Sequence, residues 1–220
     1  MNRTIRLFLL LGLAIAATNL VEAAPPRFAA EIAAFEASDK TNPPPRNAIL
    51  FTGASSIRKW KTLARDFPDH KVINRGFGGS QIIDAIYYFD RIVTPYHPKM
   101  IVFYSGGNDI NSGKTPEMVV DDFKTFVQKV ETTLPDTKVA FISINASPVR
   151  WKDVEKVKQA NRAIAAFMAK SDRRMFIDTY SAMLDANGRP RPELYLQDRL
   201  HPNAKGYAIW TSVIAPYLNR

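Results

Sequence analysis

The chain has no cysteine and only three histidines among its 220 residues. Without cysteine there is no disulfide framework, and no lipid-modified cysteine can stand at a cleavage site. The histidines, at positions 70, 97 and 201, are dispersed, so the sequence offers no cluster of metal ligands. Internal repeats and low-complexity segments are absent as well. These absences predict a protein that needs neither metal nor cofactor.

The first 23 residues have the layout of a secretory signal. A basic start is followed by an apolar run over residues 7–17 and by a small-residue cleavage site over 21–23. An uncleaved membrane anchor is the alternative, but the run is short for a span and Thr18-Asn19 interrupts it. We therefore expect an exported protein, periplasmic or secreted, that starts near Ala24 and has no stable membrane anchor. About 200 residues remain, enough for one sizeable core.

The formal net charge is +9, which becomes +8 once the two arginines and one glutamate of the predicted signal are removed. A basic chain invites anionic partners, including nucleic acid. The lysines and arginines are scattered through amphipathic segments, however, and form no basic patch interleaved with aromatic residues. We expect solvated charged faces and no nucleic-acid partner. The oligomeric state stays open.

Short apolar, β-branched runs alternate with segments that carry apolar residues at helical spacing. The predicted strands cover residues 48–53, 71–74, 100–105, 138–144 and 174–178. The predicted helices cover residues 59–67, 81–91, 117–134, 154–170 and 203–218. Because the strands are apolar on both faces, the pattern predicts an α/β fold with a parallel sheet between two helix layers.

Residues 24–46 lead into this fold. A short helix is expected over residues 28–38, and the proline-rich segment 41–45 then forms an extended strap. The main domain covers residues 47–220.

Loops that follow the strands of a parallel sheet meet at one edge, where ligands bind. Ser55 follows the first strand, residues 76–80 follow the second, and residues 106–109 follow the third. His70 and His97 precede the second and third strands, so they belong to the opposite edge. Only His201 is then available as a base beside Ser55.

Asp198 stands three positions before His201, a spacing that lets its carboxylate bond the near ring nitrogen and leaves the far one for a serine. The alternative is a turn residue beside a loop histidine. The glycine-rich loop 74–80 lacks a dinucleotide fingerprint and a phosphate-loop lysine. Its glycines either permit a tight turn or expose an N–H to a developing oxyanion. Asn108, likewise, is either an oxyanion donor or an ordinary turn former.

Four blocks together resemble the SGNH/GDSL hydrolases across the whole mature chain: residues 53–55, Gly79, residues 106–109 and residues 198–201. The resemblance implies a flavodoxin-like three-layer α/β/α sandwich. It implies Ser55 as nucleophile, His201 as base and Asp198 as its orienting carboxylate. The oxyanion hole would comprise the N–H groups of Ser55 and Gly79 and the side chain of Asn108.

The first block departs from the family pattern at Ala54, where an aspartate is usual. It resembles a subgroup that reads Gly-small-Ser-Ser-Ile-Arg, as residues 53–58 do. The departure leaves the triad intact but weakens any transfer of substrate preference from the lipases. Ser56 is a rival nucleophile, although its place suits a helix N-cap better.

The predicted reaction is ester hydrolysis through an acyl-enzyme, without cofactor. Since no long lid-like insertion separates the elements, we expect small or peripheral acyl groups, such as acetyl esters of carbohydrate or cell-wall glycan. A group of residues after the fourth strand is expected on the alcohol side: Asn145, Ser147, Arg150 and Trp151. The alternatives are a lysophospholipase or thioesterase with the same catalytic groups, and a glycan-binding relative without catalysis.

Overall fold

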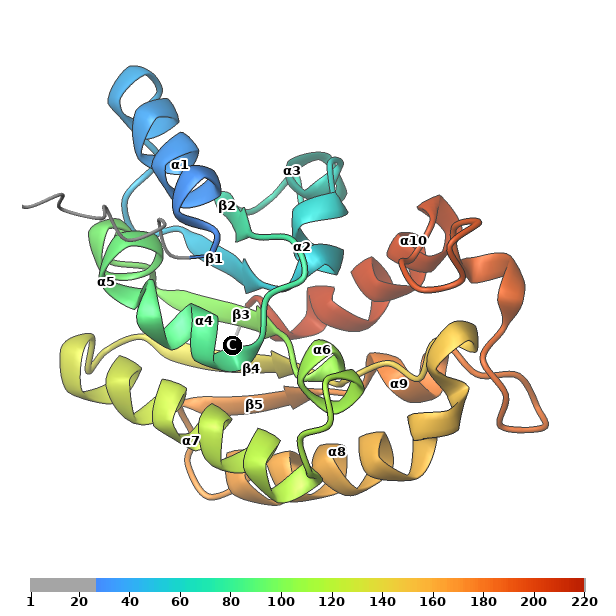
Figure 1. Ribbon diagram of the computed structural model, residues 1–220. Coiled ribbons are helices and arrows are strands. Elements are labelled where there is room, and N and C mark those ends of the chain that lie inside the picture. Colours follow the sequence, from blue (N-terminus) through green and yellow to red (C-terminus); the bar gives the residue numbers. More distant parts are fainter. Residues whose placement is uncertain (1–26, 220) are drawn as a thin grey trace, which may run out of the picture.

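Five short strands form the centre of the computed structural model, which describes residues 27–219 (Figure 1). They are β1 (Ile49–Gly53), β2 (Val72–Gly76), β3 (Met100–Tyr104), β4 (Lys138–Ile142) and β5 (Arg174–Ile177). Every neighbouring pair is parallel, in the order β2-β1-β3-β4-β5. The predicted five-stranded parallel sheet is thereby confirmed.

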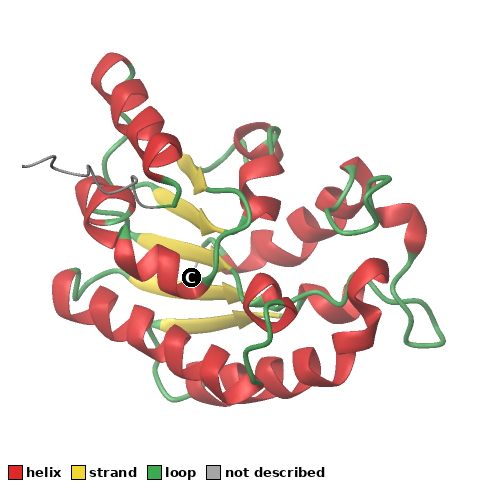
Figure 2. Cartoon of the chain, viewed as in Figure 1, coloured by secondary structure: helices red, strands yellow, loops and turns green. Residues whose placement is uncertain are grey.

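Helices cover both faces of the sheet and enclose it, as Figure 2 shows. One face carries α1 (Ala29–Thr41), α4 (Ile82–Tyr87), α5 (Phe89–Ile92), α7 (Pro116–Thr133) and α8 (Val154–Met168). The other carries α2 (Ser55–Lys59), α3 (Leu63–Asp66) and α10 (Ala204–Ile214). Two short helices follow strand ends: α6 (Gly107–Asn111) and α9 (Thr179–Ala182). This is the predicted three-layer α/β/α sandwich.

The strands form because their side chains are buried on both sides. In β1, Ile49 and Phe51 join the core under α2 and α10, whereas Leu50 joins the core under α4 and α7. All three are fully buried. Burying each such side chain stabilises the fold by about 1.5–3 kcal/mol. The rigid centre that results holds the loops at the carboxyl ends of the strands.

The predicted helix over residues 59–67 is confirmed only at α3 (Leu63–Asp66) and at Lys59, where α2 ends. The helix α2 begins earlier, at Ser55, and the chain turns at Trp60 before α3. The cause is the Trp60 indole, which is 1% exposed, packs against Trp210 and donates to Asp66 Oδ2 at 2.6 Å. Burying the ring and satisfying its N–H outweigh helix continuation.

Other element boundaries shift for local reasons. The predicted helix over 81–91 divides at Tyr88 into α4 and α5, because the Tyr88 ring turns inward against Phe77. The strand β2 continues to Gly76, in register with Gly53. The lead-in helix α1 runs to Thr41, and the sequence pattern does not predict α6 or α9.

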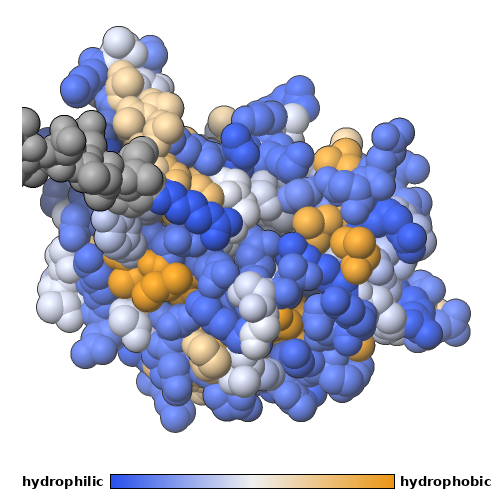
Figure 3. Space-filling view, viewed as in Figure 1, coloured by the Kyte–Doolittle hydropathy of each residue, from blue (hydrophilic) through white to orange (hydrophobic). Residues whose placement is uncertain are grey.

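The described surface is mostly hydrophilic on the side drawn in Figure 3, with small separate apolar patches. Over residues 27–219 no helix has the length and apolar character needed to cross a membrane. The predicted signal over residues 1–23 lies outside the described residues.

Candidate active site

Three predicted site residues meet at the carboxyl edge of the sheet. Ser55 Oγ lies 2.7 Å from His201 Nε2, although 146 positions separate the two residues. His201 Nδ1 lies 2.7 Å from Asp198 Oδ2. This chain of contacts runs from hydroxyl to imidazole to carboxylate, which is the arrangement that activates a serine hydroxyl.

Ser55 stands on a sharp turn between β1 and α2. Gly53 makes the turn possible, because it has φ +118° and an added Cβ would lie 2.1 Å from the Tyr104 carbonyl oxygen. Ala54 donates its N–H to that same oxygen at 2.8 Å and is itself buried. Ser55 is then the first residue of α2, and its N–H has no acceptor within residues 27–219.

Ser56 does not cap the helix, so that expectation is wrong. It lies inside α2, one residue after Ser55, and is 6% exposed. Its carbonyl accepts a hydrogen bond from the Tyr207 hydroxyl at 2.8 Å. The residue therefore ties α2 to α10 from within the protein.

The loop that carries the histidine is closed by its own hydrogen bonds. Asp198 Oδ1 accepts the N–H groups of Leu200 and His201, at 2.9 and 3.0 Å. Leu196 donates its N–H to the His201 carbonyl at 2.8 Å, and Arg199 takes a left-handed φ of 55°. The same carboxylate thus closes the turn with one oxygen and bonds the imidazole with the other.

Electrostatics favour the ionised carboxylate at Asp198. Burial raises the pKa of this group, but the hydrogen bonds from His201 and from the Leu200 N–H outweigh it and lower the pKa to about 2. An ionised carboxylate holds the proton of His201 on Nδ1. The Nε2 atom is then free to accept the proton of Ser55.

Asn108 lies in α6 beside the serine, and its amide orientation is fixed from both ends. Its Nδ2 donates to the Ser80 carbonyl at 2.9 Å, and its Oδ1 accepts from Arg150 Nη2 at 3.0 Å. The amide nitrogen carries two N–H donors, so one remains available for a ligand. The sequence predicts Arg150 only as a lining residue of the alcohol side, and it holds no signal for the contact with Asn108.

Gly79 lies in the turn between β2 and α4, with φ +71°. Within residues 27–219 its N–H has no acceptor. The next residue, Ser80, bonds Asn108, so the second and third loops are joined. A further link comes from Asp109, whose Oδ1 accepts the Ile82 N–H at 3.2 Å.

A cavity of about 20 Å³ lies beside the serine. Roughly 10–15 Å³ is needed to hold one water molecule, so the cavity accommodates a group about the size of a methyl. The lining residues lie at or after the ends of β1, β3 and β4 or belong to the loop of His201, and Gly79 is not among them: Ala54, Ser55, Ser56, Tyr104, Gly107, Asn108, Asn145, Ser147, Arg150, Leu200 and His201. Three of the four residues expected on the alcohol side are present, and Trp151 is not among them.

Tyr104 is a lining residue that the sequence did not single out. Burial raises the pKa of its hydroxyl, and the hydrogen bond that its oxygen accepts from the Asn145 backbone, the charge of Arg150 and the Ser56 side chain oppose this only in part. Tyr104 is therefore a neutral hydroxyl in the site.

The other two histidines lie at the opposite edge of the sheet. His70 precedes β2, and His97 precedes β3 in a surface pocket that it shares with Asn47 and Asp136. Both are too far from Ser55 to act as its base. In the described part of the chain no group of three or more His, Cys, Asp or Glu could hold a metal ion.

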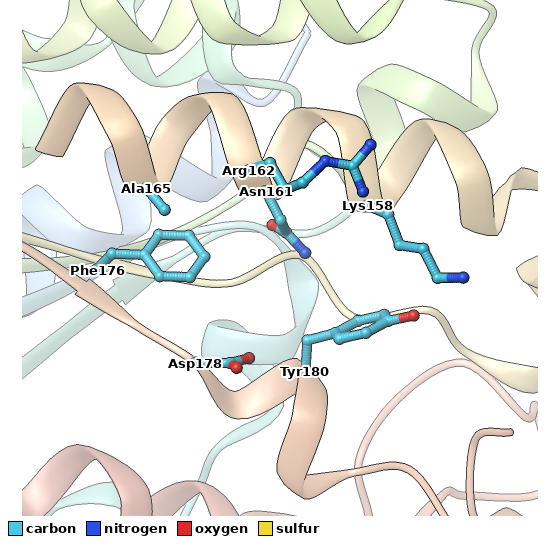
Figure 4. A pocket seen from close by; sticks show the side chains of 7 residues that line it. All are labelled: Lys158, Asn161, Arg162, Ala165, Phe176, Asp178 and Tyr180. Atoms are coloured by element: carbon cyan, nitrogen blue, oxygen red, sulfur yellow. The ribbon is translucent and has the colours of Figure 1, made fainter. Parts of the chain in front are cut away.

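A larger cavity, of about 210 Å³, lies between α8 and the segment after β5. Figure 4 shows Asn161 and Lys158 of α8 directed toward the side of Phe176 and Tyr180, while the Arg162 side chain runs along the helix. None of the predicted site residues lines it. The chemistry described above therefore belongs to the smaller cavity.

Comparison with known proteins places the chain in a family. The model described as "GDSL-like Lipase/Acylhydrolase family" matches residues 42–209. The chain belongs to this family, and it is a hydrolase acting on ester bonds. A search of the curated proteins found no match.

Solved structures share the fold. A GDSL-like lipase from Bacteroides thetaiotaomicron VPI-5482 is similar with a TM-score of 0.74 and 20% identity, over 86% of this chain and 98% of that one. A lipase/acylhydrolase from Enterococcus faecalis gives 0.62 and 20%, over 77% and 94%. An acetylxylan esterase from Geobacillus stearothermophilus gives 0.62 and 13%, over 78% and 94%.

Proposed function

We propose that this chain is a serine esterase that removes small acyl groups through an acyl-enzyme. The observation that carries the proposal is the continuous contact from Ser55 Oγ through the His201 ring to the Asp198 carboxylate, 2.7 Å at each step. Ser55 is the nucleophile, His201 the general base and Asp198 the group that orients it.

In the proposed reaction Ser55 Oγ attacks the ester carbonyl carbon while His201 Nε2 takes the hydroxyl proton. The carbonyl oxygen becomes an oxyanion, which accepts hydrogen bonds from the N–H groups of Ser55 and Gly79 and from Asn108 Nδ2. The tetrahedral intermediate expels the alcohol, which takes the proton from His201. Water, deprotonated by the same imidazole, then attacks the acyl-enzyme, releases the acid and restores Ser55.

The small volume beside the serine, about 20 Å³, supports a short acyl group such as acetyl. The alcohol side of the cavity is polar, with Asn145, Ser147 and Arg150, which suits a hydroxylated alcohol such as a sugar. We propose acetyl esters of carbohydrate or cell-wall glycan as the substrate class. The predicted signal at residues 1–23 supports an exported location, where such glycans occur.

A panel of esters tests this function. Acetyl, butyryl, octanoyl and palmitoyl esters of one alcohol, together with acetylated sugars, are offered to the purified protein and to Ser55→Ala. We expect the highest kcat/KM for acetyl esters, a steep fall with acyl length, and near-background rates for Ser55→Ala. Loss of Ser55 with retained activity would contradict the proposed nucleophile.

A lysophospholipase or thioesterase is the second candidate, favoured by apolar side chains on two loops of the site. Val149 is 54% exposed and Leu196 is 41% exposed. The Val149 N–H donates to the Arg199 carbonyl at 3.3 Å, so the two loops are joined. A long acyl chain could lie across this rim outside the small cavity. Rates that rise from acetyl to palmitoyl would favour this candidate over the first.

A further inference from the structure

Residues at the start of α1 and just before it contact the loop between β2 and α4. We call Phe77–Gly79 the oxyanion loop, and Arg27, Phe28 and Glu31 the lead-in residues. The Phe28 and Phe77 rings pack edge to face, with centroids 5.2 Å apart. The Gly78 N–H donates to both Glu31 carboxylate oxygens at 3.3 Å, and Arg27 Nη2 donates to the Gly79 carbonyl at 2.9 Å.

Arg58 orients the carboxylate of Glu31. Its Nε lies 2.7 Å from Glu31 Oε1. Its guanidinium also lies directly against Gly78, where an added Cβ would come within 2.4 Å of Nη1. Arg58 belongs to α2, the helix that begins at Ser55. The lead-in residues, the oxyanion loop and the nucleophile helix are therefore joined through one ion pair.

These contacts hold the peptide unit that carries the Gly79 N–H. The unit before it bears the Gly78 N–H, which Glu31 binds, and the unit after it bears the Gly79 carbonyl, which Arg27 binds. Two successive glycines would otherwise rotate this peptide at low energetic cost, because glycine tolerates positive and negative φ alike. A rotated peptide would turn its N–H away from the oxyanion.

We propose that Glu31, oriented by Arg58 and assisted by Arg27, is a positioning residue that keeps the Gly79 N–H directed at the oxyanion. Neither Glu31 nor Arg27 falls within residues 42–209, the part matched by the family model. The inference rests on the proposed function, since it assigns a role to the oxyanion hole of that reaction. It makes α1 part of the catalytic apparatus.

Glu36 provides a matched control on the same helix. It pairs with Arg91 through two contacts of 2.6 and 2.7 Å, five residues further along α1 than Glu31, and within the described residues its carboxylate makes no hydrogen bond to the oxyanion loop. The variants are Glu31→Ala, Glu31→Gln, Glu36→Ala and Glu36→Gln. Each is tested for kcat and KM with an acetyl ester and for the second-order rate of Ser55 phosphonylation by an alkyl fluorophosphonate. Melting curves give the folded fraction, by which the rates are corrected.

Complete loss of one oxyanion donor lowers kcat by ~10²–10³. Since the Gly79 N–H remains present but is less well oriented, we expect Glu31→Ala to lower kcat and the phosphonylation rate by about 10-fold, with KM within twofold. Glu31→Gln keeps an acceptor for the Gly78 N–H and should lie between Glu31→Ala and wild type. Both Glu36 variants should stay within twofold of wild type.

The outcomes separate the two proposals. If wild type neither hydrolyses an ester nor reacts with the fluorophosphonate, the proposed function fails and the role of Glu31 fails with it. If wild type reacts and Glu31→Ala matches Glu36→Ala in all corrected rates, only the positioning role is overturned. A fall in melting temperature with unchanged corrected rates would also overturn the positioning role, because it shows Glu31 to be structural.

Discussion

Two regions of the candidate site each contain one carboxylate, Asp109 or Asp198, and the fold holds these two carboxylates in different ways. Asp109, next to Asn108 in α6, has a fully buried side chain. Asp198, three residues before His201, has a side chain that is 41% exposed. Both lie at the same edge of the sheet. Asp109 is held by groups in the protein interior, whereas Asp198 is held by groups at the surface.

The bonds of the two carboxylates differ accordingly. Asp109 binds the Ile82 N–H of α4 at 3.2 Å, 27 positions away, and Lys114 Nζ at 2.9 Å, five positions further along the chain. Among residues 27–219, Asp198 binds its own turn alone, through Leu200 and His201. The geometry of Asn108 therefore depends on the global fold, whereas that of His201 depends on a short local turn. Changes in the first region should reduce stability and activity together, and changes in the second should reduce mainly activity, with a small effect on stability.

The largest expected effect is on activity and concerns His201, in the exposed turn that Asp198 closes. His201→Ala should lower kcat for an acetyl ester by about 10⁶, since loss of the base leaves the serine hydroxyl unactivated. The melting temperature should change little, because the ring contacts mainly its own loop and Ser55. His70→Ala and His97→Ala are the controls and should keep most activity. Inactivity of either control while still folded would contradict the assignment of the base.

Asn108→Ala tests the region of α6, where the neighbouring Asp109 is buried. We expect kcat to fall by ~10²–10³ with little change in KM, because the amide bonds the oxygen most strongly when charge develops. Stability should fall as well, since the bonds to Ser80 and Arg150 are lost. Asn111→Ala, an exposed residue at the end of the same helix, is the matched control. A kcat within a few-fold of wild type would remove Asn108 from the proposed oxyanion hole.

The same contrast explains what could be predicted from the sequence. The strands could be predicted because their apolar residues are contiguous, and the contact of Asp198 with His201 because three residues of spacing and one turn determine it. The meeting of Ser55 with His201 followed from parallel topology, which sends every strand's carboxyl end to one edge. The catalytic roles of these residues stay predictions until they are tested.

Features that depend on distant partners could not be predicted. Arg150 bonds an amide 42 positions away, and Glu31 bonds a glycine 47 positions away. No local pattern marks either residue. The division of the predicted helix at Trp60 has the same origin, because helical spacing around Trp60 competes with the burial of its indole against Trp210. Long-range packing overrode the local signal at Trp60, whereas Arg150 and Glu31 carried no local signal.

A smaller effect, on stability, is expected at Asp109. Asp109→Ala leaves the Ile82 N–H without its acceptor and removes one of the two acidic partners of Lys114, so unfolding free energy should fall by about 3 kcal/mol. Asp109→Asn should cost less, because an amide oxygen still accepts the Ile82 N–H and carries no buried charge. Asp121→Asn is the control: its pair with Lys124 is exposed and is worth roughly 0–1 kcal/mol. Chemical denaturation measures all three, and equal losses would contradict the dependence on burial.

The smallest effect is the response to acid, and here the two carboxylates should act with opposite signs. Hydrogen bonds, working against burial, lower the pKa of Asp198 from 3.8 to about 2. Its contribution to stability is therefore present above pH 3.8 and is lost as the pH falls toward 2. Burial raises the pKa of Asp109, and Lys114 opposes the shift only in part. Its contribution is therefore present below pH 3.8 and is lost as the pH rises through the higher folded pKa.

Free energies of unfolding between about pH 2 and pH 7 separate these contributions. Asp198→Asn should be less stable than wild type, by an amount that grows as the pH rises from about 2 to 4. In wild type the buried charge of Asp109 should lower the unfolding free energy increasingly above about pH 4, and Asp109→Asn should lack this loss. The Asp198 difference should be small and should shrink further in high salt, because the side chain is 41% exposed. The Asp109 difference should persist in salt, since its carboxylate is fully buried. Differences of the same sign in both variants would show that burial does not distinguish the two regions.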